Sequence, residues 1–198
     1  MMRASYRESE RNLKAVFSWL LMSLLSTPVW ADSARAPFDY TKEVAGGKYV
    51  FVMLAARGGS LFDPGAPDDV GVIDPDRGVR KTYKLSGLYP ADQAVPLWTV
   101  SWYAFTVFPA SDGDHLVRLG PWASSTEQLA VAFYSKGVEL KRYLIRDLVK
   151  DPTRLRNSVS HFFWIAADHF DDRAQRFYLK TVDGNEYTFS ILTGEIIP

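Results

Sequence analysis

The chain has 198 residues, with 23 basic and 23 acidic side chains, so its formal net charge at neutral pH is zero. This balance argues against a nucleic-acid-binding protein, because such proteins carry clustered basic charge. The chain contains no cysteine, which excludes disulfides, thiolate metal sites and the lipid-bearing cysteine of a bacterial lipoprotein.

The first predicted element is a short apolar run, Ala15–Leu25, behind a start with four basic and two acidic residues. A membrane-crossing helix needs about 20 apolar residues, and Pro28 interrupts any helix at this point. Val29-Trp30-Ala31 then has the small-x-small form that a signal peptidase accepts. This order predicts a secretory signal peptide over residues 1–31. An uncleaved anchor or an N-terminal core helix is the alternative.

Cleavage after Ala31 would place the remaining chain outside the cytoplasm. It removes four basic and two acidic residues, which leaves 19 basic and 21 acidic ones. The mature chain has no block rich in Lys and Arg, so attachment to anionic lipid is not expected. The sequence therefore predicts a periplasmic or secreted bacterial protein with no stable membrane anchor after cleavage and no nucleic-acid partner.

Residues 32–47 are expected to form a polar leader, and residues 48–198 a single β-rich domain. The stretch Lys48–Ala55 is apolar at successive positions, which is typical of a strand covered on both faces. The stretch Arg57–Gly71 is rich in Gly, Pro and Asp and predicts a long exposed loop.

After this loop the sequence alternates strand, glycine turn and strand. Turns are predicted near Gly78, at Asp112-Gly113, near Gly137 and at Asp183-Gly184, because tight hairpin turns need positive φ. Helix is scarce. Residues 142–155 are expected to start as a strand and to end in one helical turn.

Alternation is clearest in the last hairpin, where Tyr187, Phe189 and Ile191 are separated by polar residues. The patterning predicts an all-β fold, an antiparallel meander of hairpins, with a curved sheet, a small sandwich and a partial propeller as alternatives. The segments SDGDHLV and LTGEII resemble hairpins in propeller blades and in small exported bacterial β-domains. The resemblance implies strands but no particular activity, and the chain is too short for a full propeller ring.

The densest group of candidate metal ligands lies in Ala167–Arg173. Asp168, His169, Asp171 and Asp172 are residue types that bind divalent metals. No spaced motif such as H-E-x-x-H specifies a geometry for them, so a solvated loop between two strands is the alternative. A second acidic group, from Asp63 to Asp76, departs from a calcium loop because no glutamate stands at the twelfth position.

Aromatic residues gather between Pro96 and Phe108. On a strand, Trp98 and Trp102 would share one face and Tyr103 would lie on the other. Trp98, Trp102 and Tyr103 are therefore candidates for stacking on a sugar or a peptide, and packing in the core is the alternative.

No catalytic or nucleotide-binding motif is present in the sequence. The expected function is that of an exported, non-catalytic β-domain that binds or scaffolds in the cell envelope. An envelope protein, a glycan or a peptide is the expected partner, and no cofactor is expected. The alternative is a metal-dependent or histidine-dependent hydrolase with its site around Asp168 and His169.

Overall fold

A computed structural model describes residues 37–56, 78–157 and 161–198, all of which belong to one compact unit that extends from Ser33 to Pro198. The predicted signal peptide and the whole of the predicted loop 57–71 lie outside the described residues. Within the described residues the structure is built mainly of antiparallel strands with few helices, which confirms the all-β prediction.

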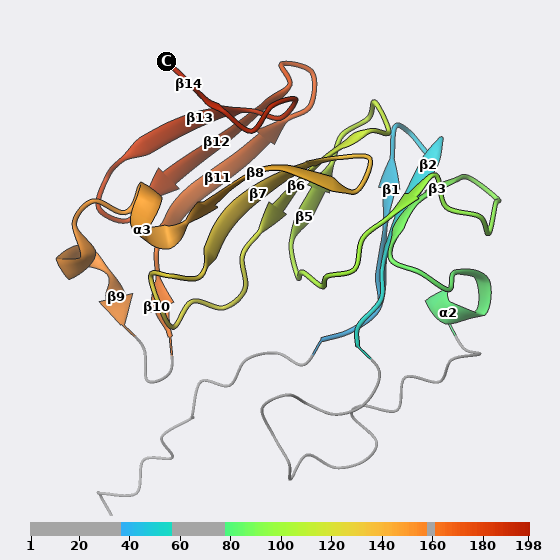
Figure 1. Cartoon of the computed structure of the whole chain (residues 1–198), viewed down its shortest axis with the longest axis horizontal. Coiled ribbons are helices and arrows are strands. Elements are labelled where there is room, and N and C mark those ends of the chain that lie inside the picture. The colour runs from blue at the N-terminus through green and yellow to red at the C-terminus, as the bar shows by residue number, and fades with distance from the viewer. Residues whose placement is uncertain (1–36, 57–77, 158–160) are drawn as a thin grey trace, which may run out of the picture. The chain divides into compact units, whose positions relative to one another are not determined.

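Three four-stranded antiparallel sheets follow one another along the chain, each with its strands in sequence order (Figure 1). The first sheet contains β1 (Tyr40–Val44), β2 (Tyr49–Met53), β3 (Gly87–Pro90) and β4 (Trp98–Thr99). The second contains β5 (Val107–Pro109), β6 (His115–Leu119), β7 (Leu129–Ser135) and β8 (Val138–Leu144). The third contains β11 (Ile165–Asp171), β12 (Arg176–Thr181), β13 (Glu186–Ser190) and β14 (Ile196–Ile197). A four-stranded meander of this kind is the arrangement of one propeller blade.

Short elements fill the connections between the sheets. Helix α2 (Val79–Thr82) precedes β3, and helix α3 (Ile145–Leu148) follows β8. A 3₁₀ turn at Pro152–Arg154 then leads into the two-stranded ribbon of β9 (Arg156–Asn157) and β10 (Phe162–Phe163). The single helical turn expected after the strand that begins near residue 142 is therefore present as α3.

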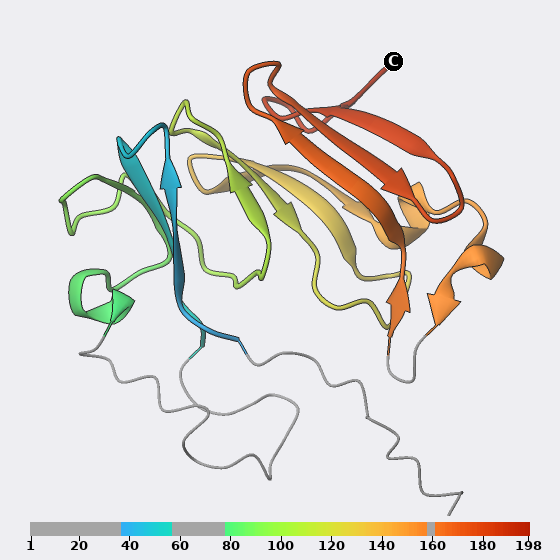
Figure 2. The same cartoon turned by 180° about the vertical axis from the view of Figure 1, so that it is seen from behind.

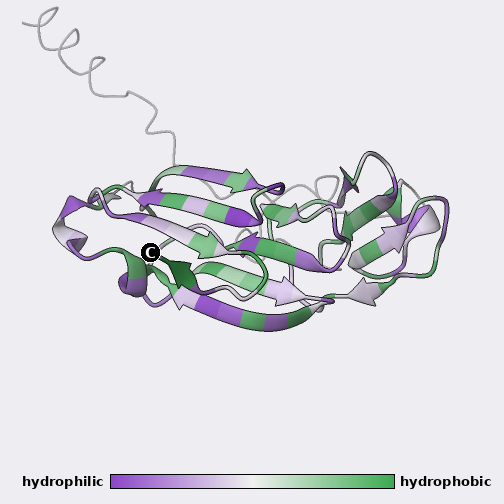
Figure 3. Ribbon diagram, turned by 90° about the horizontal axis from the view of Figure 1, so that it is seen from above, coloured by the Kyte–Doolittle hydropathy of each residue, from purple (hydrophilic) through white to green (hydrophobic). Residues whose placement is uncertain are grey.

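The second sheet lies between the other two (Figures 1 and 2). Successive side chains of a strand point to opposite faces, and Figure 3 shows hydrophobic and hydrophilic bands alternating along the strands. Leu116 of β6 belongs to the same buried core as Phe51 and Trp98 of the first sheet, whereas Val117 belongs to the core that includes Phe177 of the third. Both faces of the second sheet are thus covered, which explains why β7 is apolar at successive positions.

The first strands of the three sheets run in the same direction. The Tyr40 hydroxyl donates to the Ala104 carbonyl at 2.7 Å, and the Lys42 ammonium donates further along to the Val107 carbonyl at 2.9 Å. Phe108 then stacks on Phe170 of β11 at 5.6 Å between ring centroids. Beyond these rings, Ser111 bonds to Asp172, so the contacts advance together along the chain in both pairs of strands. Strands β1, β5 and β11 are therefore parallel to one another and begin at one end of the unit.

Most of the long connections lie at one end of the unit and most of the tight turns at the other (Figure 1). The connections after β2, β4, β6 and β8 reach the end at which β1, β5 and β11 begin, which we call the loop end. The connections after β1, β5, β7 and β11 are tight turns at the opposite end, which we call the turn end. Binding residues are commonly carried on loops that a rigid scaffold positions, so the loop end is where a site is expected.

The predicted Asp112-Gly113 turn joins all three sheets at the turn end. The Gly113 carbonyl accepts the indole N–H of Trp98 at 2.8 Å, from the first sheet. The Ser111 N–H donates to the Asp172 carboxylate at 3.1 Å, from the third sheet. Within the turn, the Asp112 carboxylate lies 2.7 Å from Nδ1 of His115. Burial opposes ionisation of Asp112, but hydrogen bonds from the backbone N–H groups of His115 and Asp114 lower its pKa overall.

Three local expectations differ from the structure. Strand β1 lies inside the segment 32–47 that was expected as a polar leader, because Tyr40, Lys42 and Val44 alternate inward and Lys42 finds a carbonyl partner. The hairpin expected near Gly78 is not formed on its described side, where α2 follows instead. The segment Ala167–Arg173, for which a metal site or a solvated loop was predicted, is largely the strand β11 because it pairs along its length with β12.

Candidate functional site

Exposed aromatic side chains mark the loop end. Four large aromatic residues are exposed among the described residues: Phe38 (37%), Phe105 (38%), Trp122 (38%) and Phe163 (56%). Phe38 precedes β1, Phe105 precedes β5, Trp122 follows β6, and Phe163 lies in β10 just before β11. All four therefore belong to the end at which the first strands begin. We call these four residues the aromatic end.

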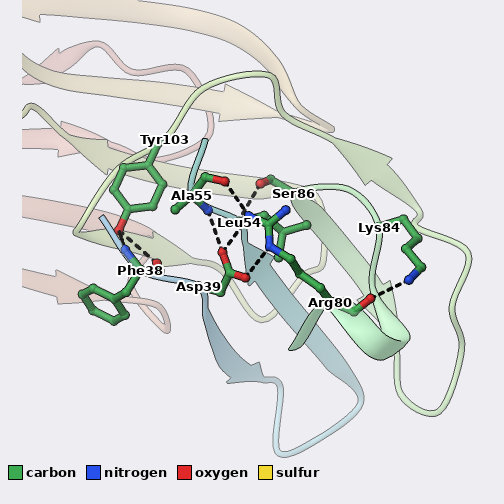
Figure 4. Close-up of polar contacts among 8 residues, drawn as sticks. All are labelled: Phe38, Asp39, Leu54, Ala55, Arg80, Lys84, Ser86 and Tyr103. Atoms are coloured by element: carbon green, nitrogen blue, oxygen red, sulfur yellow. Dashed lines mark hydrogen bonds and ion pairs between the residues drawn. The ribbon is translucent and has the colours of Figure 1, made fainter. Parts of the chain in front are cut away.

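One part of the aromatic end surrounds Tyr103. The ring of Phe105 lies edge-on to Tyr103 at 5.2 Å and 6.3 Å from the ring of Phe38. The Tyr103 hydroxyl donates to the Phe38 carbonyl and accepts from the Phe38 N–H, both at 3.1 Å (Figure 4). These bonds attach the segment before β1 to the connection after β4, so the rings are held in place before any ligand arrives.

A buried ion pair fixes the backbone behind these rings. The Arg80 guanidinium donates from Nε to Oδ2 of Asp39 at 2.6 Å and from Nη2 to Oδ1 at 2.9 Å (Figure 4). The Ala55 N–H donates to the same carboxylate at 2.8 Å, and the Ala55 carbonyl accepts from Arg80. The pair thus joins α2, the end of β2 and the segment before β1. Every charge in it has a partner, which makes it a clamp for the backbone rather than a binding group.

Burial also changes the ionisation of groups between β1 and β5. Desolvation, with a smaller contribution from the nearby Tyr103, raises the pKa of the Tyr40 hydroxyl well above its ordinary value. Desolvation lowers the pKa of the Lys42 ammonium. Both groups bond to backbone carbonyls of the connection into β5. They hold the first two sheets together next to the aromatic end.

A second part of the aromatic end is formed by Trp122, His161 and Phe163. The His161 ring lies between the other two, with centroid distances of 4.0 Å to Trp122 and 4.7 Å to Phe163. The Phe162 N–H donates to the Ala123 carbonyl at 2.8 Å and ties β10 to the connection after β6. His161 is buried, while the flanking rings are exposed. The arrangement presents two apolar ring surfaces on a fixed support.

The three aromatic residues predicted as a ligand-binding face lie in different surroundings. Trp98 is buried in the core between the first two sheets, and its indole N–H is bonded to Gly113. Trp102 packs on the same core, 4.9 Å from the ring of Tyr134, with the Arg118 guanidinium 4.3 Å from its ring centre. Of the three, only Tyr103 is in contact with the aromatic end. The burial of Trp98 agrees with the alternative interpretation of the aromatic stretch, which was packing in the core.

The predicted metal ligands are not brought together. Asp168 and His169 are neighbours on β11 and so point to opposite faces of the third sheet. His169 stacks on Tyr178 of β12 at 5.9 Å. Asp171 accepts from the Ala174 N–H, and Asp172 accepts from the Ser111 N–H. In the part of the chain that the structure describes, no group of three His, Asp or Glu side chains is arranged to hold a metal ion. The acidic group from Asp63 to Asp76 lies outside the described residues.

Sequence reasoning did not identify Phe38, Trp122 or Phe163 as site residues. Phe38 and Trp122 stand in polar or mixed segments, whereas Phe163 lies between Phe162 and Trp164. No local spacing links these three residues to one another. The available signal was weak: each stands beside the start of a predicted strand or in a connection.

Comparison with known proteins does not assign this chain to a family. No protein-family model matches this sequence, and no curated protein matches it. Among the described residues, no helix has both the length and the apolar character needed to cross a bilayer.

Proposed function

We propose that this protein is an exported, non-catalytic domain that binds or scaffolds in the cell envelope, in the periplasm or outside the cell. The partner contacts the aromatic end. The observation that supports this most is the segregation of exposed side chains: all four exposed large aromatic residues of the described chain lie at the loop end. Exposed aromatic residues on a rigid support are typical of recognition surfaces.

The geometry supports the alternative function, a hydrolase with its site around Asp168 and His169, less well than it supports binding. These two side chains leave β11 on opposite faces, so they do not act on one substrate atom as acid and base. His115 is engaged with Asp112 in a turn at the other end of the unit. His161 is enclosed by two aromatic rings. His169 stacks on Tyr178, and the Asp112 carboxylate beside His115 also accepts backbone N–H groups of its own turn.

A binding assay with matched variants tests the proposal. The mature chain, residues 32–198, is screened against a glycan array and an immobilised peptide library. Phe105→Ala with Phe163→Ala removes one ring from each part of the aromatic end. Val138→Ala with Leu192→Ala is the control, because these residues are similarly exposed but lie toward the turn end.

The expected result is a ligand whose affinity falls about tenfold or more in the aromatic double variant and stays unchanged in the control. A ligand bound equally well by both variants would place recognition elsewhere. Hydrolysis of any arrayed glycan or peptide by the wild-type protein would contradict the non-catalytic assignment.

A further inference from the structure

We infer that Arg118, which contacts Trp102 and Tyr103, binds a carboxylate group of an acidic peptide segment of the partner. The inference rests on the proposed function, because it names the chemistry that the same end of the unit would recognise. Arg118 pairs with Val107 at the start of β5, so it lies beside the connection that carries Trp102 and Tyr103.

Arg118 is a half-buried cation that the fold does not neutralise. Its guanidinium lies 4.3 Å from the centre of the Trp102 ring, and Nη2 donates to the Tyr103 carbonyl at 3.3 Å. Its Nε is enclosed and has no hydrogen-bond partner. In the part of the chain that the structure describes, no carboxylate lies within ion-pair distance of Arg118. A guanidinium has five N–H donors, so Arg118 keeps donors for a ligand.

Arg80 shows how the same chain satisfies a structural arginine. Arg80 donates from Nε and Nη2 to both oxygens of Asp39, and also to the Ala55 carbonyl. Arg118 has no acid in the place that Asp39 takes. A buried polar group without a partner costs free energy, and one in a native protein calls for an explanation such as a bound ion. A carboxylate supplied by the partner would give Arg118 the counter-charge that the fold withholds.

The neighbouring charges favour a ligand group with a single negative charge. Glu139 accepts from Nε and Nη2 of Arg142 at 2.5 and 2.8 Å and from the Tyr134 hydroxyl at 3.1 Å. Arg118 and Arg142 are both cross-strand neighbours of Ala132, whose small side chain separates them. Two guanidinium groups and one carboxylate leave one excess positive charge. A carboxylate balances this charge, whereas a phosphate carries about 1.5 to 2 negative charges.

The surroundings of Arg118 favour a peptide as the source of the carboxylate. The Trp102 ring supports the flat guanidinium, which fixes the direction of its N–H fork. The Tyr103 ring contacts the exposed Phe105 at 5.2 Å, and Phe105 lies 6.3 Å from the exposed Phe38. These phenylalanine rings have no polar atoms for the hydroxyl groups of a sugar, but they pack well on apolar side chains. A segment with an acidic residue next to apolar ones fits both features.

Matched acids and neutral counterparts test this inference. The mature chain, residues 32–198, keeps both hydrophobic cores, which contain no residue before Tyr40. It is screened against immobilised peptides in which each Asp or Glu is paired with Asn or Gln, and against acidic glycans paired with their methyl esters. The variants are Arg118→Met and Arg118→Gln, with Arg146→Met as the control. Arg146 lies at the same end but is already paired with Glu127. Circular dichroism first confirms a strand-dominated fold in every variant.

The expected result is an acidic peptide that the wild type binds about tenfold or more tightly than the neutral counterpart. Arg118→Met and Arg118→Gln should bind the two peptides equally, and Arg146→Met should keep the wild-type preference. The melting temperature of Arg118→Met should equal or exceed that of the wild type, because an apolar side chain replaces a cation without a counter-charge. If Arg118→Met does not fold, Arg118→Gln, which keeps a donor for the Tyr103 carbonyl, decides the question.

Other outcomes overturn the inference. Equal binding of acidic and neutral peptides by the wild type would do so, as would a preference that both Arg118 variants retain. A preference confined to acidic glycans would show that the partner is not a peptide. In each case a loss of binding in Phe105→Ala with Phe163→Ala would still support the proposed function. If the wild type binds none of these compounds, both proposals are wrong.

Discussion

Asp39 and Arg80 form a buried two-point ion pair across 41 residues of sequence, with Nε–Oδ2 and Nη2–Oδ1 distances of 2.6 and 2.9 Å. The pair joins the segment before β1 to α2, and the Ala55 backbone bonds to both partners. It therefore closes the loop end of the first sheet with an interaction that water does not screen effectively. Its removal should affect stability far more than the loss of a surface pair.

Asp39→Ala is expected to lower the free energy of unfolding by about 3 kcal/mol, because it leaves Arg80 buried without a counter-charge. Adding Arg80→Met to this variant should recover at least about 1 kcal/mol, since no unpaired charge then remains. The control is Asp114→Ala, which breaks the exposed pair with Lys136 and should cost less than about 1 kcal/mol. Urea unfolding measures all three values. Equal losses in the Asp39 and Asp114 variants would show that the clamp is not needed.

Gly113→Ala is expected to be more destabilising than Gly184→Ala. Both glycines have positive φ, +78° and +94°, so both substitutions introduce backbone strain of about 1 kcal/mol. A Cβ at Gly113 would also lie 2.9 Å from the ring of Tyr49, whereas a Cβ at Gly184 meets open space. We expect an additional loss of about 1–2 kcal/mol at Gly113. Thermal unfolding of the two variants compares them, and equal melting temperatures would contradict the close contact between these sheets.

The stability contributed by Tyr40 is expected to disappear at alkaline pH. Burial raises the pKa of Tyr40 above that of an unfolded tyrosine, which is about 10. The unfolded chain then loses this proton at a lower pH than the folded chain, so the contribution is complete below about pH 10 and falls above it. Tyr40→Phe removes this titration and the bond to Ala104, at a cost of about 1 kcal/mol at neutral pH.

The measurement is the free energy of unfolding of the wild type and of Tyr40→Phe from neutral pH to about pH 11. The difference in free energy of unfolding between the two proteins should become smaller above about pH 10. Lys42 and the other tyrosines titrate in both proteins and largely cancel in the difference. A constant gap over this range would mean that Tyr40 is not shielded from water.

Asp183 is expected to contribute stability that is lost in acid. Burial opposes its ionisation, but hydrogen bonds from Thr181, from the backbone N–H groups of Asp151 and Lys150, and from Asn185 lower its pKa well below the usual range. A group whose pKa is lowered by folding stabilises the protein above the unfolded value of about 4, and less as the pH falls further.

Asp183→Asn therefore should cost about 1 kcal/mol at neutral pH, and the difference from the wild type should shrink below about pH 4. Asp151→Asn is a suitable control, because Asp151 caps only Thr153 in the neighbouring turn. Unfolding by urea at neutral and acid pH gives the comparison. If the difference in free energy of unfolding instead grew in acid, folding would raise the pKa of Asp183 and not lower it.

Much of the fold could be predicted because its information is local. The turns at Asp112-Gly113, Gly137 and Asp183-Gly184 all have positive φ at the glycine, and the sequence places each between strand-like runs. The apolar run at β2 is buried on both faces, as its composition predicts. A hairpin is made by residues close in sequence, so its pattern is visible without knowledge of the rest of the chain.

The sequence by itself determined the β class, the hairpin turns and the doubly covered strands of this protein. Only the tertiary structure decided that Trp98 is core, that Asp168 and His169 point apart, and that Phe38 meets Phe105 at one end. The physical reason is that these features depend on contacts between residues far apart in the sequence. Which face of a strand is covered depends on the stacking of separate sheets, and the contacts that hold these sheets together, such as Phe38–Tyr103 and Ser111–Asp172, join residues 61 to 65 positions apart.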